Sequence, residues 1–139
     1  MKTLNTLIRL HKRTLDELRR EMVSLENQKT KLQEATVSLQ KELESEVALA
    51  GKQVEMASFF GEFAKRIKNR QEELRAEIRA IDAKITKLNE DIFVAFTELK
   101  KIEIAKQNAL ERKKAAENRK ETIMLDEIAS QQYTRRNQP

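Results

Sequence analysis

The amino-acid sequence predicts an all-α protein, an antiparallel two-helix coiled-coil hairpin with a rod-like form. Apolar residues recur at alternating steps of three and four along two long stretches. The chain holds two glycines and one proline, the terminal Pro139, so almost nothing interrupts a helix. Residues 58–63, between the two stretches, carry three of the five phenylalanines and one of the two glycines. Alternating steps average about 3.5 residues, so each apolar stripe stays on one side of a helix only if that helix supercoils around a partner.

The first helix is expected over residues 3–57, with Thr3 or Asn5 able to cap its first turn. Ten of the fourteen positions of its heptad ladder are apolar. Polar residues in such a seam can specify the register of pairing, or a long seam can simply tolerate them. The sequence leaves both interpretations open. The ladder runs Leu4, Ile8, His11, Leu15, Leu18, Met22, Leu25, Lys29, Leu32, Thr36, Leu39, Leu43, Glu46 and Ala50.

The reversal of the chain is expected at residues 58–61, because Gly61 can adopt the left-handed conformation that ends a helix. Ser58 could equally cap a following helix. A second helix is then expected over 62–131 with a frayed tail over 132–139, all within a single domain of residues 1–139. A turn centred near residue 59 places residue i opposite about 118 − i, so that Val37 faces Ile81 and Leu4 faces Lys114.

The second helix carries a ladder whose first nine positions are all apolar. From Lys106 to Lys120 its positions alternate between lysine and alanine, and its last two positions are Ile123 and Glu127. The full ladder runs Leu74, Ile78, Ile81, Ile85, Leu88, Ile92, Ala95, Leu99, Ile102, Lys106, Ala109, Lys113, Ala116, Lys120, Ile123 and Glu127.

Charge is distributed unevenly along the chain. The formal net charge is +5, whereas residues 1–20 and 106–120 each carry a local net of +4 and residues 33–55 carry −3. The expected register places the two basic segments side by side at the open end of the hairpin. Such a cluster suits an acidic partner surface. Simple solvation of a helix face explains it equally well.

Catalytic and metal-binding chemistry find little support. The chain has no cysteine, and its one histidine, His11, occupies a ladder position. Phosphate loops, serine-nucleophile motifs and zinc motifs are missing from the sequence. We therefore expect no enzyme activity, no cofactor, no metal and no small-molecule substrate. Basic clusters and aromatic residues are largely separate, which argues against nucleic-acid binding. No apolar stretch approaches the ~20 residues that span a bilayer, so a cytoplasmic location is expected.

The aromatic residues suggest two interpretations. Phe59, Phe60 and Phe63 either close the tip of the hairpin or form an exposed apolar anchor for a partner. Phe93 and Phe96 lie beside the second ladder and, with Val94, could mark a lateral contact patch; a widened core is the plainer explanation.

The opening helix begins with a Leu-x-x-Leu pair, continues through basic residues and reaches an Asp-Glu-x-Arg element. The residues are Leu4, Leu7, Arg9, Lys12, Arg13, Asp16, Glu17, Arg19 and Arg20. This pattern, the chain length and the single break between two long helices resemble FliJ-type flagellar export proteins. The resemblance covers essentially the whole chain, and the opening helix and the Phe-Phe-Gly stretch are its most distinctive parts.

The resemblance implies a non-enzymatic stalk that inserts into the hexameric ring of the flagellar export ATPase and couples it to the export gate. It also implies contact with export chaperones and peripheral association with the membrane export apparatus. The charge argument adds the ATPase-contacting residues Arg9, Lys12, Arg13, Arg19, Arg20, Lys113 and Lys114. The gate contact is expected at Phe59, Phe60 and Phe63. A free monomer is expected; the alternatives are a parallel homodimeric coiled-coil scaffold and an adaptor unrelated to export, on nucleic acid or an anionic membrane.

Overall fold

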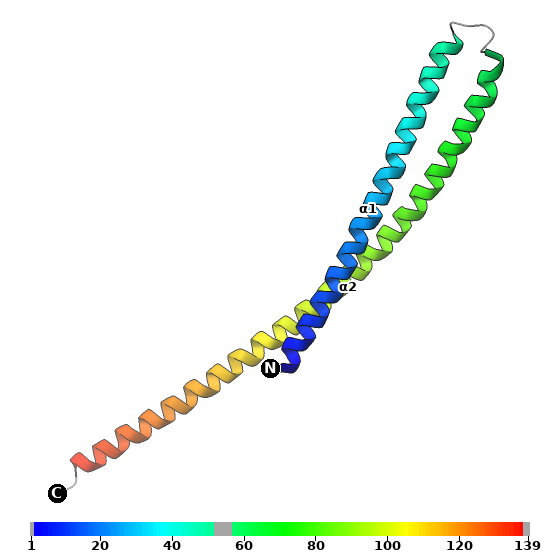
Figure 1. Ribbon diagram of the computed structural model, residues 1–139. Helices are drawn as coiled ribbons and strands as arrows, with labels where there is room; N and C mark the ends of the chain where they lie inside the picture. Colours follow the sequence, from blue (N-terminus) through cyan, green and yellow to red (C-terminus); the bar gives the residue numbers. More distant parts are fainter. Residues whose placement is uncertain (1, 52–56, 138–139) are drawn as a thin grey trace. The chain divides into compact units, whose positions relative to one another are not determined.

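The protein is built from two long helices, α1 over Lys2–Ala50 and α2 over Ala57–Arg136 (Figure 1). The computed structural model describes residues 2–51 and 57–137, and within these no β-strand is present. The described residues form two compact units: a hairpin unit of residues 13–95, and a terminal unit of residues 1–12 with 96–139. The all-α class and the pairing of two long helices are therefore confirmed.

In the hairpin unit, the α1 and α2 segments run side by side in opposite directions (Figure 1). Met22, Leu25 and Leu88 form its central buried cluster, with further ladder residues packed against them. Leu74 is only 1% exposed. Burying a leucine fully contributes about 1.5–3 kcal/mol, so this seam is the main source of the unit's stability. The partly buried residues around the cluster are Leu18, Ile81, Ile85 and Ile92.

The heptad ladders identify the buried face correctly over most of their length. Every position of the first ladder, from Leu4 to Ala50, is buried or half-buried. The second ladder is likewise covered from Leu74 to Ala109. It also continues further toward the N-terminus of α2 than predicted, because Ile67 and Gln71 are buried too.

The predicted register is wrong by seven residue numbers. A salt bridge and a hydrogen bond cross from α1 to α2: Lys29 to Asp82 at 2.7 Å, and Gln71 to Gln40 at 3.1 Å. In both pairs the residue numbers add to 111 rather than 118. Val37 accordingly does not face Ile81 in the seam and is 54% exposed. A shift of seven is one heptad, which brings apolar positions opposite apolar positions again, so the ladders alone cannot reject it.

The position of the reversal is also corrected. Residues 58–61, the expected turn, lie within α2, and Gly61 has no positive φ. α1 ends at Ala50 rather than near residue 57, and Gly51 follows in a turn in which its amide donates to the Val47 carbonyl at 3.1 Å. The remainder of the expected first helix, 52–56, lies outside the described residues. α1 therefore ends directly before Gly51, which lies seven residues before the first residue of the expected turn.

The terminal unit combines residues 2–12 of α1 with residues 96–136 of α2. Leu99 is 5% exposed and is the buried centre of this unit among the described residues. From residue 111 to residue 137 every position is exposed. The last ladder positions, Lys113, Ala116, Lys120, Ile123 and Glu127, therefore do not form a seam, and Lys114 does not face Leu4 across one. α2 extends to Arg136, so most of the tail expected to fray is helical.

Candidate partner-binding surfaces

All seven basic residues predicted to contact a partner are exposed. The structure does not gather them into one unit. Four belong to the terminal unit and three to the hairpin unit. The terminal four are Arg9, Lys12, Lys113 and Lys114, and the hairpin three are Arg13, Arg19 and Arg20.

In the part of the chain that the structure describes, ion pairs are confined to the middle. Every ion pair among the described residues lies between Lys29 and Glu103. Most of them link neighbours on one helix, such as Lys87 with Asp91 at 3.2 Å. None of the seven predicted contact cations has an acidic partner within the described part of the chain. Their charge is left to solvent or to an acidic surface, and such unpaired charge raises the rate at which an oppositely charged partner associates.

The exposed end of α2 also presents apolar side chains, which the ladder did not predict. Met124, Leu125 and Ile128 are 61%, 66% and 48% exposed. Their spacing of three and four places them on one face of the helix, beside the predicted ladder position Ile123 rather than on it. A search of the second helix for apolar residues three and four apart in every helical phase would have found this face. Extending the ladder from Leu74 follows only one phase.

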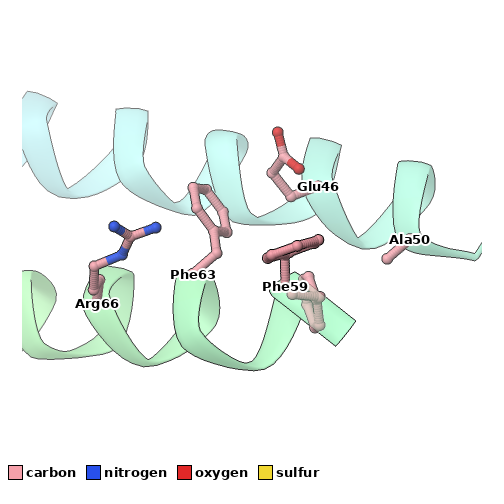
Figure 2. Close-up of a pocket in the computed structure, with 6 residues that line it drawn as sticks. Glu46, Ala50, Phe59, Phe63 and Arg66 are labelled. Carbon is pink, nitrogen blue, oxygen red and sulfur yellow. The ribbon is translucent and has the colours of Figure 1, made fainter. Parts of the chain in front are cut away.

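The three phenylalanines near the tip of the hairpin unit behave differently from one another. Phe59 is 76% exposed, whereas Phe60 and Phe63 are half-buried. A pocket of about 160 Å³ lies here, lined by the three rings together with Glu46, Ala50 and Arg66. Phe63 and Arg66 extend from α2 toward α1 (Figure 2). Two rings thus help to close the tip and one is available to a partner.

The lateral aromatic residues are also exposed. Phe93 and Val94, in the hairpin unit, are 70% and 59% exposed. Phe96, in the terminal unit, is 41% exposed and lies under the Lys100 ammonium, whose Nζ is 5.4 Å from the ring centroid. A widened core does not account for side chains this exposed.

The polar ladder positions have different surroundings. His11 is half-buried, and the Thr36 hydroxyl donates to the Leu32 carbonyl of its own helix at 3.0 Å. Lys29 instead reaches across the seam to Asp82. Gln71, which sequence reasoning missed, is 6% exposed and bonds to Gln40 on the other helix.

Residues that could hold a metal ion do not cluster. Among the residues that the structure describes, no group of three or more His, Cys, Asp or Glu side chains is placed to ligate one. No described helix is long and apolar enough to cross a membrane. What the surface does offer is unpaired positive charge and exposed apolar side chains on two helices, an arrangement suited to binding other proteins.

The family model described as flagellar FliJ protein matches residues 1–138. The chain belongs to the FliJ family. Comparison with curated proteins and with solved structures gave no match. Membership assigns this FliJ-family chain a role related to flagellar protein export, as a non-catalytic component. The resemblance drawn from the opening helix and the two-helix plan is confirmed.

Proposed function

We propose that the protein is a non-enzymatic stalk and coupling factor of flagellar export, which binds the export ATPase ring through its basic residues. The observation that carries this proposal is the exposed set of seven cations without acidic partners within the described residues. Family membership supplies the export context. The exposed apolar side chains Met124, Leu125 and Ile128 support the same proposal, because a partner would remove them from water.

The exposed aromatic ring at the hairpin tip supports a second contact, with the cytoplasmic domain of the export gate. Phe59 resembles the aromatic anchors that dominate many protein interfaces. Linking ring and gate places the protein in the cytoplasm, peripherally at the membrane export apparatus. Contacts with export chaperones, in a general chaperone-like role, complete the proposal.

A monomer in the free state fits this function better than a parallel homodimeric scaffold. The hairpin unit already buries its apolar seam between two segments of one chain. A parallel dimer would have to replace those contacts. Sedimentation equilibrium at micromolar concentration should therefore give the 16.2 kDa of one chain, and twice that mass would contradict the monomer.

Charge reversal tests the ATPase contact. Replacing Arg9, Arg13, Lys113 and Lys114 by glutamate should abolish stimulation of the export ATPase while far-ultraviolet circular dichroism stays unchanged. The matched control reverses four other exposed cations that have no acidic partner among the described residues: Lys31, Lys41, Arg79 and Lys84. Stimulation should survive in the control. If it also survives in the first variant, the contact lies elsewhere.

A split of the cations identifies which unit binds. One variant carries glutamate at Arg9, Lys12, Lys113 and Lys114 of the terminal unit, and the other at Arg13, Arg19 and Arg20 of the hairpin unit. Loss of stimulation in only one of them assigns the contact to that unit.

The gate contact is tested by Phe59→Ala. The variant should lose binding to the gate's cytoplasmic domain in a pull-down without a change in melting temperature, because Phe59 is mostly exposed. Phe93→Ala, at a similarly exposed ring, is the control and should bind normally.

A further inference from the structure

The apolar seam of the hairpin unit does not define a unique register. Both ladders repeat every seven residues, so sliding one helix past the other by one heptad again sets ladder position against ladder position. Leu25, which packs in the cluster with Leu88, would meet another apolar residue of the same ladder. Hydrophobic burial therefore separates the observed register only weakly from its neighbours.

Two polar contacts do distinguish the registers. The Lys29 ammonium lies 2.7 Å from an Asp82 carboxylate oxygen. Gln71 is 6% exposed, and its amide nitrogen donates to the Gln40 side-chain oxygen at 3.1 Å. Both contacts cross from α1 to α2, and both require the same register.

A slip in either direction removes both contacts. When paired residue numbers add to 118, Lys29 faces the neutral Asn89, and Gln71 faces Val47, which offers its amide no partner. When they add to 104, Lys29 faces Arg75. Burying an amide without a hydrogen bond is unfavourable, and placing like charges opposite each other is too. In the register that adds to 104, Gln71 would face Gln33, whereas the slip toward Asn89 avoids the like charges and leaves the amide unpaired. The slip toward Asn89 is the one that moves the last turn of α1 away from the tip.

The register also determines whether Glu46 and Ala50 cover the aromatic rings of Phe60 and Phe63. In the observed register Glu46 and Ala50, the last turn of α1, line the pocket with Phe60 and Phe63. A one-heptad slip toward Asn89 moves this turn by about 10 Å along α2, at 1.5 Å per residue. Ala50 would then lie opposite Lys68, and Glu46 and Ala50 would no longer cover the two rings.

We propose that the hairpin unit has a second register one heptad away, in which Glu46 and Ala50 no longer cover Phe60 and Phe63, and that Lys29–Asp82 and Gln40–Gln71 hold the observed one. The polar residues of the seam thus act as a register lock. This inference does not depend on the function proposed above.

Distance measurements between spin labels test the lock, and the chain has no native cysteine to interfere. Labels on Asn27→Cys and Asn69→Cys report sliding, because both positions are exposed and lie on different helices, staggered along the unit. A slip toward Asn89 lengthens their separation by up to about 10 Å. Labels on Asn69→Cys and Glu90→Cys, both on α2, form the control pair, whose distance does not change with register.

Two variants should populate the longer distance. Alanine at Lys29, Asp82, Gln40 and Gln71 together removes the lock without adding large apolar pairs to the observed register, and the ratio of longer to observed distance should rise at least about tenfold, equivalent to about 1.4 kcal/mol. Exchanging Asp82→Asn with Asn89→Asp keeps the composition and moves the carboxylate one heptad along α2. The ratio should rise severalfold there as well.

The exchange variant decides between the registers if the alanine variant misfolds. A single unchanged distance in the folded exchange variant, or in both variants, would overturn the proposal. A reversed pair, Lys29→Asp with Asp82→Lys, should keep the observed distance, since it restores the contact in the original register.

Discussion

The hairpin unit and the exposed end of α2, residues 111–136, are both continuous helix, yet they differ in what covers them. In the hairpin unit every ladder position is buried or half-buried. Ion pairs join partly exposed side chains, along one helix as in Lys87 with Asp91 and across the seam as in Lys29 with Asp82. Along 111–136 all side chains are exposed, and ion pairs among the described residues stop at Glu103. Heptad spacing shows that a helix is able to pair, but it does not show that a partner is present within the chain.

The comparison has an energetic consequence. Most helix stability in proteins comes from packing of an apolar face rather than from the helix propensity of its residues. The hairpin unit has that packing and the exposed end does not. A partner that bound the exposed end would supply it, which agrees with the proposed contact with the ATPase ring.

Hydrogen exchange should show the largest difference between the two regions. Amides near Leu74 and Leu88 should exchange only on unfolding of the hairpin unit, and those of 115–130 through local opening. The protection factors should differ by about a thousandfold or more, given the span of local stabilities in native proteins. Equal protection in both regions would show that the exposed end is already packed against something. Adding the export ATPase should raise protection in 115–130 if the proposed contact is right.

Leucine truncation gives the next largest effect. Leu74→Ala should lower the free energy of unfolding by about 2–5 kcal/mol, because the side chain is 1% exposed and its removal leaves a cavity. Leu125→Ala, at 66% exposure, is the matched control and should change stability by less than about 0.5 kcal/mol. Urea denaturation followed by circular dichroism measures both. Coinciding curves for the two variants would place Leu74 outside the core.

The sequence was sufficient to predict the class, the two helices and the buried face. Steps of three and four and the scarcity of glycine and proline determine these features locally, residue by residue. It was not sufficient for the register, because a seven-residue repeat looks the same after a slip of one heptad. The contacts that settle the register, Lys29 with Asp82 and Gln71 with Gln40, join residues 53 and 31 positions apart in the chain.

The candidate sites were predictable to a similar degree. Exposure of the basic residues follows from their charge, and their lack of acidic neighbours follows from the local excess of Lys and Arg. Their distribution over two units depends on packing between distant parts of the chain, which residue types alone do not specify. The end of α1 was predicted wrongly because the helix was expected to continue past Gly51 to a reversal at residues 58–61. The exposed face of Met124, Leu125 and Ile128 was missed because the ladder was extended past Ala109, the last of its positions that is half-buried.

Glycine replacement tests the corrected helix boundary. Gly61 lies inside α2, is exposed, and has open space where a Cβ would stand. Gly61→Ala should therefore raise the free energy of unfolding by about 0.5–1 kcal/mol, the difference in helix propensity. Gly51→Ala is the control, since Gly51 follows the end of α1. Its gain should be smaller, and thermal denaturation measures both. A loss of stability in Gly61→Ala would instead support a turn at residues 58–61.

The smallest expected effect concerns two lysines: Lys29, which pairs with Asp82, and Lys114, which has no acidic partner among the described residues. Lys29 and Asp82 are 33% and 47% exposed, so solvent screens their attraction. A double-mutant cycle with Lys29→Met and Asp82→Asn should give a coupling energy of about 0.2–1 kcal/mol at low salt. Lys114→Met, at an exposed position of 111–136, should leave stability unchanged. Raising the ionic strength to about 1 M shortens the screening length to about 3 Å and should weaken the coupling. A coupling energy of zero at low salt would mean that, of the two polar contacts described between α1 and α2, Gln40–Gln71 fixes the register.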